Sequence, residues 1–145
     1  MSEQQLRQTV SALDMRRAQL ENLSQQQELI RGSIDEHLRA KETLENYLKI
    51  DKDDELLVPV GAGIFIKTRT GDQKEALSGI GSGIVLERDI KEIVKHLDEQ
   101  LEQLKISAQE LATQTVKISG AVEELTQSAQ QQYEALQRGT NAGSS

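Results

Sequence analysis

The stretch that decides the fold is residues 55–87, in which one short pattern occurs twice. Residues 60–67 read VGAGIFIK, and residues 80–87 read IGSGIVLE. Each copy is an apolar residue, a Gly-small-Gly triplet, three apolar residues and a charged residue. Glycine adopts the positive φ angles of tight turns and bulges, so each copy predicts the turn of a β-hairpin. The expected strands are residues 56–60, 64–69, 75–80 and 84–86.

The residues before this stretch predict a long amphipathic helix over residues 1–50, which contain no Pro and a single Gly. Its apolar stripe follows a seven-residue repeat through Leu6, Leu13, Leu20, Gln27, Ile34, Lys41 and Leu48. Further apolar residues flank the stripe at Val10, Leu23, Ile30, Leu38 and Leu44. A straight helix drifts by about 20° per heptad, so a stripe that wanders is expected.

The residues after the repeat predict a second long helix, over residues 87–138, with the most regular pattern in the chain. Alternating steps of four and three visit Ile90, Val94, Leu97, Leu101, Leu104, Ala108, Leu111, Thr115, Ile118, Val122, Leu125, Ala129, Gln132 and Leu136. All but Thr115 and Gln132 are apolar, as in a coiled coil. Residues 139–145 are rich in Gly, Ser and Asn and predict a disordered tail.

Together these parts predict an α+β fold, a long antiparallel coiled-coil helical hairpin with two small β-hairpins at its base. The helices have similar lengths, roughly 70 and 75 Å at 1.5 Å per residue, so Leu48 should face Ile90 and Leu6 should face Gln132. Isolated hairpins are marginal in water and leave open strand edges. We therefore expect residues 51–86 to need partner chains that complete the sheet, so the protein should be an obligate oligomer. The apolar strand residues expected to form that interface are Leu56, Val58, Val60, Ile64, Phe65, Ile66, Leu77, Ile80, Ile84 and Leu86.

Composition excludes several classes of function. The formal net charge is −7, and no segment is basic, which argues against nucleic acid as a partner. Cysteine is absent, so disulfides, thiolate metal sites and cysteine nucleophiles are excluded. No apolar run is long enough to span a membrane, and the first residues do not resemble a secretory signal. We expect a cytoplasmic protein that contacts no membrane.

The residues that could form a catalytic, nucleotide-binding or metal-binding site are better explained by structural roles. The glycines around Ser82 lack the third Gly and the following helix of a dinucleotide site. His37 and His96 are the only histidines, too few for a zinc site without cysteine. The acidic run at Asp51, Asp53, Asp54 and Glu55 lacks the spacing of a calcium loop. We therefore expect no catalytic residue, no metal and no cofactor, and no enzymatic activity.

The order helix, duplicated hairpin, helix resembles the prefoldin family. Residues 55–67 and 80–87 are similar to the two β-segments of archaeal α-type subunits, whereas β-type subunits carry one hairpin. The resemblance implies a hexamer of two α and four β subunits whose strands form a barrel. It also implies an ATP-independent holdase that holds unfolded polypeptides at the coiled-coil tips and delivers them to a group II chaperonin.

The client-binding surface is expected at the tip, where both helices end and where the pairing of the helices should fray. The residues predicted to bind clients there are Leu6, Val10, Leu13, Leu125, Ala129, Tyr133 and Leu136. Two alternatives stay open. These residues could merely complete the coiled coil, and the whole chain could be a structural spacer or adaptor that multimerises through its strands.

Overall fold

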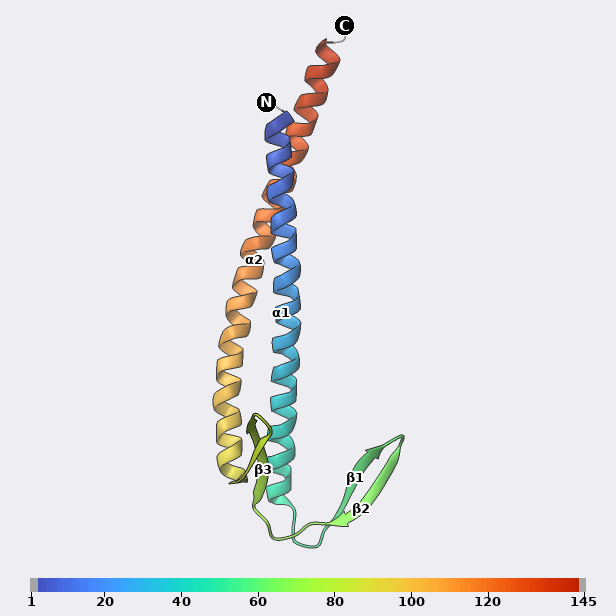
Figure 1. Ribbon diagram of the computed structural model, residues 1–145, viewed down its shortest axis with the longest axis vertical. Coiled ribbons are helices and arrows are strands. Elements are labelled where there is room, and N and C mark those ends of the chain that lie inside the picture. The colour runs from blue at the N-terminus through green and yellow to red at the C-terminus, as the bar shows by residue number, and fades with distance from the viewer. Residues whose placement is uncertain (1–2, 144–145) are drawn as a thin grey trace. The chain divides into compact units, whose positions relative to one another are not determined.

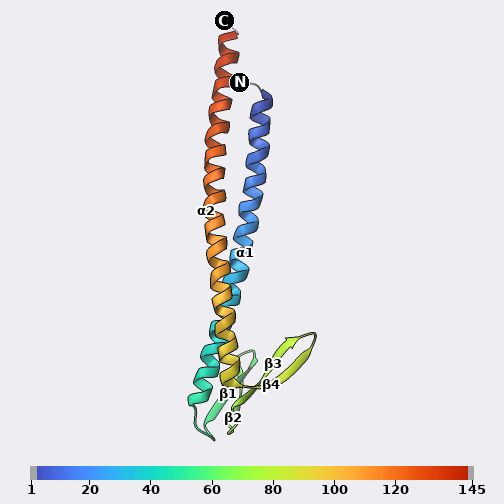
Figure 2. The ribbon, with the colours of Figure 1, turned by 90° about the vertical axis from the view of Figure 1, so that its left-hand side faces the viewer.

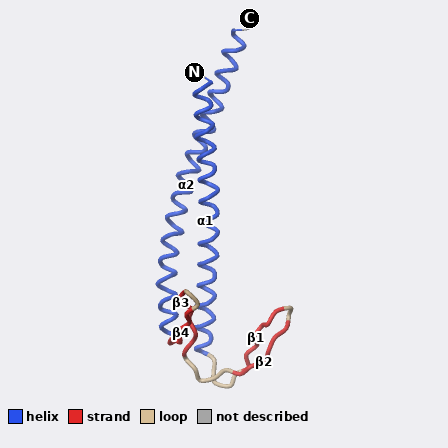
Figure 3. The backbone as a smooth tube through the Cα atoms, in the orientation of Figure 1, coloured by secondary structure: helices blue, strands red, loops and turns tan. Residues whose placement is uncertain are grey.

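The computed structural model describes residues 3–143, and it contains two long helices and four short strands (Figure 1). The order is α1 (Glu3–Lys49), β1 (Glu55–Gly61), β2 (Ile64–Arg69), β3 (Glu75–Gly81), β4 (Ile84–Asp89) and α2 (Ile90–Gly143). The strands form two separate antiparallel sheets, β1–β2 and β3–β4 (Figure 3). The predicted fold class, two long helices with two small β-hairpins between them, is therefore confirmed.

The chain divides into two compact units, which we call the terminal unit (residues 1–32 and 105–145) and the hairpin unit (residues 33–104). In the terminal unit, the first part of α1 and the last part of α2 lie side by side in antiparallel directions (Figure 2). In the hairpin unit, the end of α1 leads into the two hairpins, which lead into the start of α2.

The heptad pattern of α2 describes its packing correctly. All fourteen positions named from the sequence are buried or half-buried, and Ile90 and Leu101 are the least exposed of them. Ile93, outside that pattern, is also buried. Apolar surface removed from water at these positions is what holds two otherwise polar helices together.

In α1 the inward positions follow steps of three and four more strictly than the apolar residues do. Thr9 and His37 are half-buried, whereas the neighbouring Val10 and Leu38 are 41% and 45% exposed. Successive residues of a helix point about 100° apart, so the apolar residue beside an inward position faces outward. Lys41 also takes an inward position, and its Nζ lies 2.6 Å from Asp98 Oδ1 of α2.

Each hairpin closes through a two-residue turn that the glycines make possible. Gly61 pairs with Ile64, and the two residues between them, Ala62 and Gly63, have φ of 52° and 75°. Positive φ at both central positions defines a type I′ turn, the turn whose twist matches that of paired strands. The second hairpin repeats this geometry, with Ser82 and Gly83 at φ of 53° and 74°. The role predicted for the Gly-small-Gly triplets is confirmed.

Two boundaries drawn from the sequence are wrong. Residues 139–143 are helical rather than a disordered tail; Thr140 Oγ1 donates to Leu136 O there. The last turns of α2 follow a long helix that is already formed, so one Gly, worth about 1 kcal/mol, does not end it. Residues 144–145 lie outside the described residues. Residues 87–89 belong to β4 rather than to the second helix, because they pair with β3.

Candidate assembly and client-binding surfaces

The apolar side chains of the hairpins are exposed to solvent. Ile64, Phe65 and Ile66 of β2 are each more than half exposed, and so are Ile84 and Val85 of β4. Of the ten strand residues named from the sequence, Leu56 is half-buried and the other nine are exposed. Contiguous exposed apolar surface of this kind is typical of interaction sites.

Strand alternation sorts these residues onto two faces. In the first hairpin, Val58 pairs with Ile66 on one face, while Leu57 and Phe65 lie on the opposite face. Leu57 is 51% exposed and Val85 is 55% exposed, yet sequence reasoning left both out of the interface. The period-two alternation of the strands would have revealed them. Both faces of each hairpin are thus apolar and uncovered.

A buried hydroxyl joins the first hairpin to the loop that precedes it. Thr70 is 5% exposed, and its Oγ1 donates to Asp51 O at 2.7 Å and accepts from Asp54 N at 3.0 Å. Its backbone N–H donates to Asp54 O, and its carbonyl accepts from Asp53 N. The acidic run is therefore a hydrogen-bonded turn, with Asp53 at a φ of 68°. Sequence reasoning did not single out Thr70.

The two hairpins differ in charge at equivalent positions. Glu55 pairs with Arg69 in the first hairpin, whereas Glu75 pairs with Asp89 in the second. A hydrogen bond to Glu87 raises the pKa of the Glu75 carboxyl, and repulsion by Glu87 and Asp89 raises it further. The second hairpin therefore carries an excess of negative charge on the face where the first carries Lys67 and Arg69.

A groove lies where the two helices end in the terminal unit. Its lining includes Leu6 of α1 with Tyr133, Leu136 and Gln137 of α2. Tyr133 is 54% exposed, and its hydroxyl accepts a hydrogen bond from Gln137 Nε2 at 2.8 Å. We call this the chain-end groove. It combines apolar and hydrogen-bonding side chains in one accessible surface.

The seven residues predicted to bind clients differ in accessibility. Val10 and Tyr133 are exposed, Leu13 is buried, and four are half-buried: Leu6, Leu125, Ala129 and Leu136. Near them, Gln132 Oε1 is buried without a hydrogen-bond partner in the described part of the chain. An unpaired buried polar atom destabilises the packing around it by about 1–3 kcal/mol.

The histidines lie in one groove of the hairpin unit. His37 and His96 line it together with Glu99, and His37 Nδ1 donates to Ser33 O at 2.7 Å if the proton is on that nitrogen. Among residues 3–143, no three His, Cys, Asp or Glu side chains are grouped as a metal site requires. Within the same residues, neither helix is long and apolar enough to cross a lipid bilayer.

Comparisons with known proteins agree with this geometry. The model of the family "Prefoldin subunit" matches residues 17–135. A prefoldin subunit alpha of Methanopyrus kandleri is 39% identical over 77 residues, which are 53% of this chain and 49% of that protein, so the chain spans about half of that relative. One of Pyrococcus horikoshii is 32% identical over 115 residues, 79% of this chain and 78% of that protein.

A solved structure shares the fold. The chain resembles a subunit in the cryo-EM structure of filamentous prefoldin from Methanocaldococcus jannaschii, with a TM-score of 0.67 and 19% identity over 80% of this chain and 96% of that one. The family model covers most of the chain, including both hairpins, and the relatives it resembles are α-type subunits. The chain therefore belongs to the prefoldin family, as a subunit of the α type.

Proposed function

We propose that this chain is a subunit of an ATP-independent holdase that assembles with β-type prefoldin subunits, two copies of this chain with four of the other. The complex binds unfolded polypeptides at the helix ends and delivers them to a group II chaperonin. The observation that carries the proposal is the pair of hairpins with uncovered apolar faces in a member of the prefoldin family.

Exposed strand faces and edges support the assembly. A hairpin whose two faces are both apolar is stable only when other strands or chains cover it. Leu57 and Phe65 on one face, and Val58 and Ile66 on the other, require cover on both sides. A closed barrel built from several subunits supplies an interior for one face and strand partners for both edges.

The chain-end groove supports client binding. Tyr133 offers an exposed aromatic ring beside Leu6 and Leu136, and non-native chains expose the apolar groups that such a surface buries. The unsatisfied Gln132 Oε1 weakens helix pairing nearby, so inward residues such as Leu125 become accessible when the helices separate. Several subunits acting together convert weak contacts into avidity.

We also infer that the complex catalyses no reaction. Apart from the half-buried Asp98, the carboxylates on the described parts of the two helices are exposed, and a carboxyl group in contact with bulk water is a poor general acid at neutral pH. Client protection should therefore continue after ATP is depleted with apyrase and after metals are removed with EDTA. Loss of protection on either treatment would mean that a nucleotide or metal site takes part.

The main test is reconstitution. The full-length chain is co-expressed with a β-type subunit from the same source, and the mass of the complex is measured by native mass spectrometry. We expect a hexamer that keeps chemically denatured citrate synthase soluble, measured by light scattering without nucleotide. A hexamer that leaves aggregation unchanged would favour the alternative of a structural spacer.

The second test concerns the helix ends. Deleting residues 1–10 and 130–145 removes the chain-end groove and leaves both hairpins intact. The hexamer should still form, and protection of the client should fall sharply. Full protection by the truncated hexamer would show that these residues only complete the coiled coil.

A further inference from the structure

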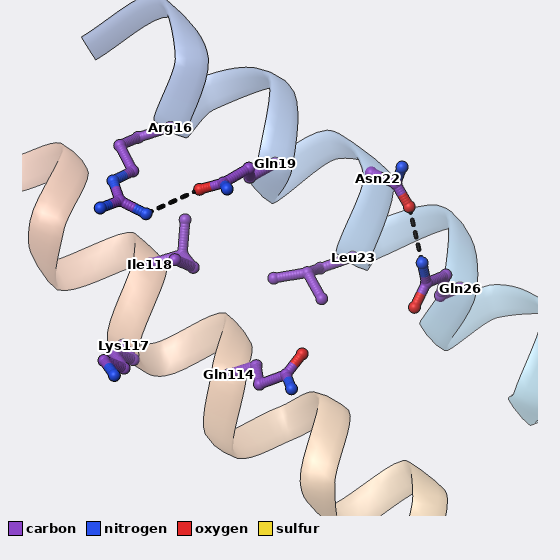
Figure 4. Close-up of a pocket in the computed structure, with 8 residues that line it drawn as sticks. All are labelled: Arg16, Gln19, Asn22, Leu23, Gln26, Gln114, Lys117 and Ile118. Carbon is purple, nitrogen blue, oxygen red and sulfur yellow. Dashed lines mark hydrogen bonds between the residues drawn. The ribbon is translucent and has the colours of Figure 1, made fainter. Parts of the chain in front are cut away.

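A second groove of the terminal unit combines positive charge with side-chain amides, and the proposed client-binding surface does not include it. Arg16, Gln19 and Leu23 of α1 line it on one side, and Gln114, Lys117 and Ile118 of α2 line it on the other (Figure 4). We call it the basic groove. Asn22 and Gln26 complete its α1 rim.

The groove exists because an arginine occupies a position of α1 where the repeat of inward residues would place an apolar side chain. Steps of three and four from Leu13 to Leu20 pass through position 16, yet Arg16 is exposed. Its Nη1 donates to Gln19 Oε1 at 2.9 Å, along the same helix. No apolar side chain fills that position, so Leu23 and Ile118, both half-buried, remain accessible as the floor of the groove.

The charge of the groove is opposite to that of the chain. Its lining includes two cations and no carboxylate, although the formal net charge of the chain is −7. Within residues 3–143, neither Arg16 nor Lys117 forms an ion pair, whereas Arg7 and Arg31 each pair with a glutamate on their own helix. Two cations in a groove that no carboxylate lines attract an anionic ligand.

The amides indicate what kind of anion fits. Gln19, Asn22, Gln26 and Gln114 each carry donor and acceptor groups, like the peptide groups of an extended chain. Gln26 Nε2 donates to Asn22 Oδ1 at 2.7 Å, which orients both amides along the rim (Figure 4). The floor formed by Leu23 and Ile118 suits an apolar side chain of the ligand.

We propose that the basic groove binds extended, acidic segments of non-native polypeptides, with ligand carboxylates beside Arg16 and Lys117. The physiological meaning of this site rests on the proposed holdase function, which it extends from apolar to acidic client segments. Nucleic acid fits less well, because the groove offers two cations and the surrounding chain is acidic.

The test uses two fluorescein-labelled, unstructured peptides and the full-length chain. One peptide is rich in Glu with interspersed Leu, and the other has Lys in place of every Glu. Fluorescence anisotropy at low ionic strength should detect binding of the Glu peptide only. Arg16→Gln with Lys117→Gln should weaken that binding about fivefold, since two exposed ion pairs together contribute about 1 kcal/mol.

The matched control is Arg17→Gln with Lys95→Gln. It removes the same charge from exposed positions that do not line the groove, so the Glu peptide should still bind as to the original chain. Circular dichroism checks that both variants keep their helices. Equal loss in both variants, equal binding of both peptides, or tighter binding of single-stranded poly(U) RNA would overturn the proposal.

Failure of this proposal is distinguishable from failure of the proposed function. The reconstituted wild-type hexamer should protect citrate synthase, because the chain-end groove is present in it. A wild-type hexamer that protects nothing would refute the holdase function, whatever the Glu peptide does. A hexamer that protects its client without binding the Glu peptide would refute the basic groove alone.

Discussion

The two hairpins have the same backbone conformation but different side chains. The comparison separates the residues that fold a hairpin from the residues that determine what it can bind. Turn geometry is the same in both, and each hairpin has a β-bulge just before its turn, between Pro59 and Gly61 in the first and between Gly79 and Gly81 in the second. Even the residue after each hairpin is equivalent: Thr70 N donates to Asp54 O, and Ile90 N donates to Lys74 O. The shared features maintain the fold.

The differences concern how each hairpin is anchored and charged. Thr70 uses its hydroxyl to hold the preceding loop, whereas Ile90 is 1% exposed and begins α2. Asp89 caps that helix, since its Oδ1 accepts from Lys91 N at 2.8 Å. The first hairpin carries Lys67 and Arg69 where the second carries Glu87 and Asp89. The hairpins therefore have the same backbone conformation but present different side chains to a binding partner.

The largest expected effect comes from a charge on the apolar face of either hairpin. Phe65→Asp and Val85→Asp alter equivalent, exposed positions, so the secondary structure of the isolated chain should not change. In the assembled complex each charge would be buried at a cost of several kcal/mol. Native mass spectrometry should show loss of the hexamer. A normal hexamer with both substitutions would refute the proposed interface.

A smaller effect is expected from the turns. Gly63→Val and Gly83→Val place a β-branched residue at φ near 75° and 74°, which should destabilise each hairpin by about 2 kcal/mol. Hydrogen exchange of the strand amides measures the loss in each hairpin separately. Ala62→Gly is the matched control and should slow exchange. Equal exchange in the valine variants and the parent would contradict the assigned turn type.

An intermediate effect is expected from removing the Thr70 hydroxyl, which anchors the first hairpin to the preceding loop. Thr70→Val removes two hydrogen bonds from a buried site and should lower stability by about 1–2 kcal/mol in chemical denaturation. Thr68→Val serves as control, because the Thr68 hydroxyl is exposed and its bond to Leu56 O is long, 3.3 Å. The two valine variants should differ clearly. Similar stability in both would mean that the Thr70 hydroxyl does not anchor the hairpin.

The smallest effect is the pH dependence of the second hairpin. Because Glu87 and Asp89 raise the pKa of Glu75, the folded hairpin binds this proton more tightly than the unfolded chain does. Stability should therefore fall as the pH rises from the ordinary pKa of glutamate through the raised pKa of Glu75. Glu75→Gln should flatten this dependence in amide exchange followed from acidic to neutral pH. An unchanged slope would contradict the proposed repulsion.

The sequence by itself determined the periodic features, since these depend on local geometry. The steps of four and three in α2 predicted fourteen inward positions from Ile90 to Leu136, and all fourteen are buried or half-buried. The Gly-small-Gly triplets predicted both turns, because few residues tolerate the positive φ that a type I′ turn needs. The list of interface residues drawn from the sequence left out Leu57 and Val85, although the alternation of side chains along a strand places each of them on an apolar face.

Only the tertiary structure decided which side chains meet across long separations in the chain. The inward position of His37 instead of Leu38 depends on how α1 is rotated against α2, and composition favoured the leucine. Thr70 reaches Asp51 only because the hairpin between them closes. The basic groove forms because Arg16 turns along its own helix, which opens space beside residues nearly a hundred positions further along the chain. Burial and hydrogen bonding of this kind depend on how two segments pack against each other, so the sequence of one segment alone does not predict them.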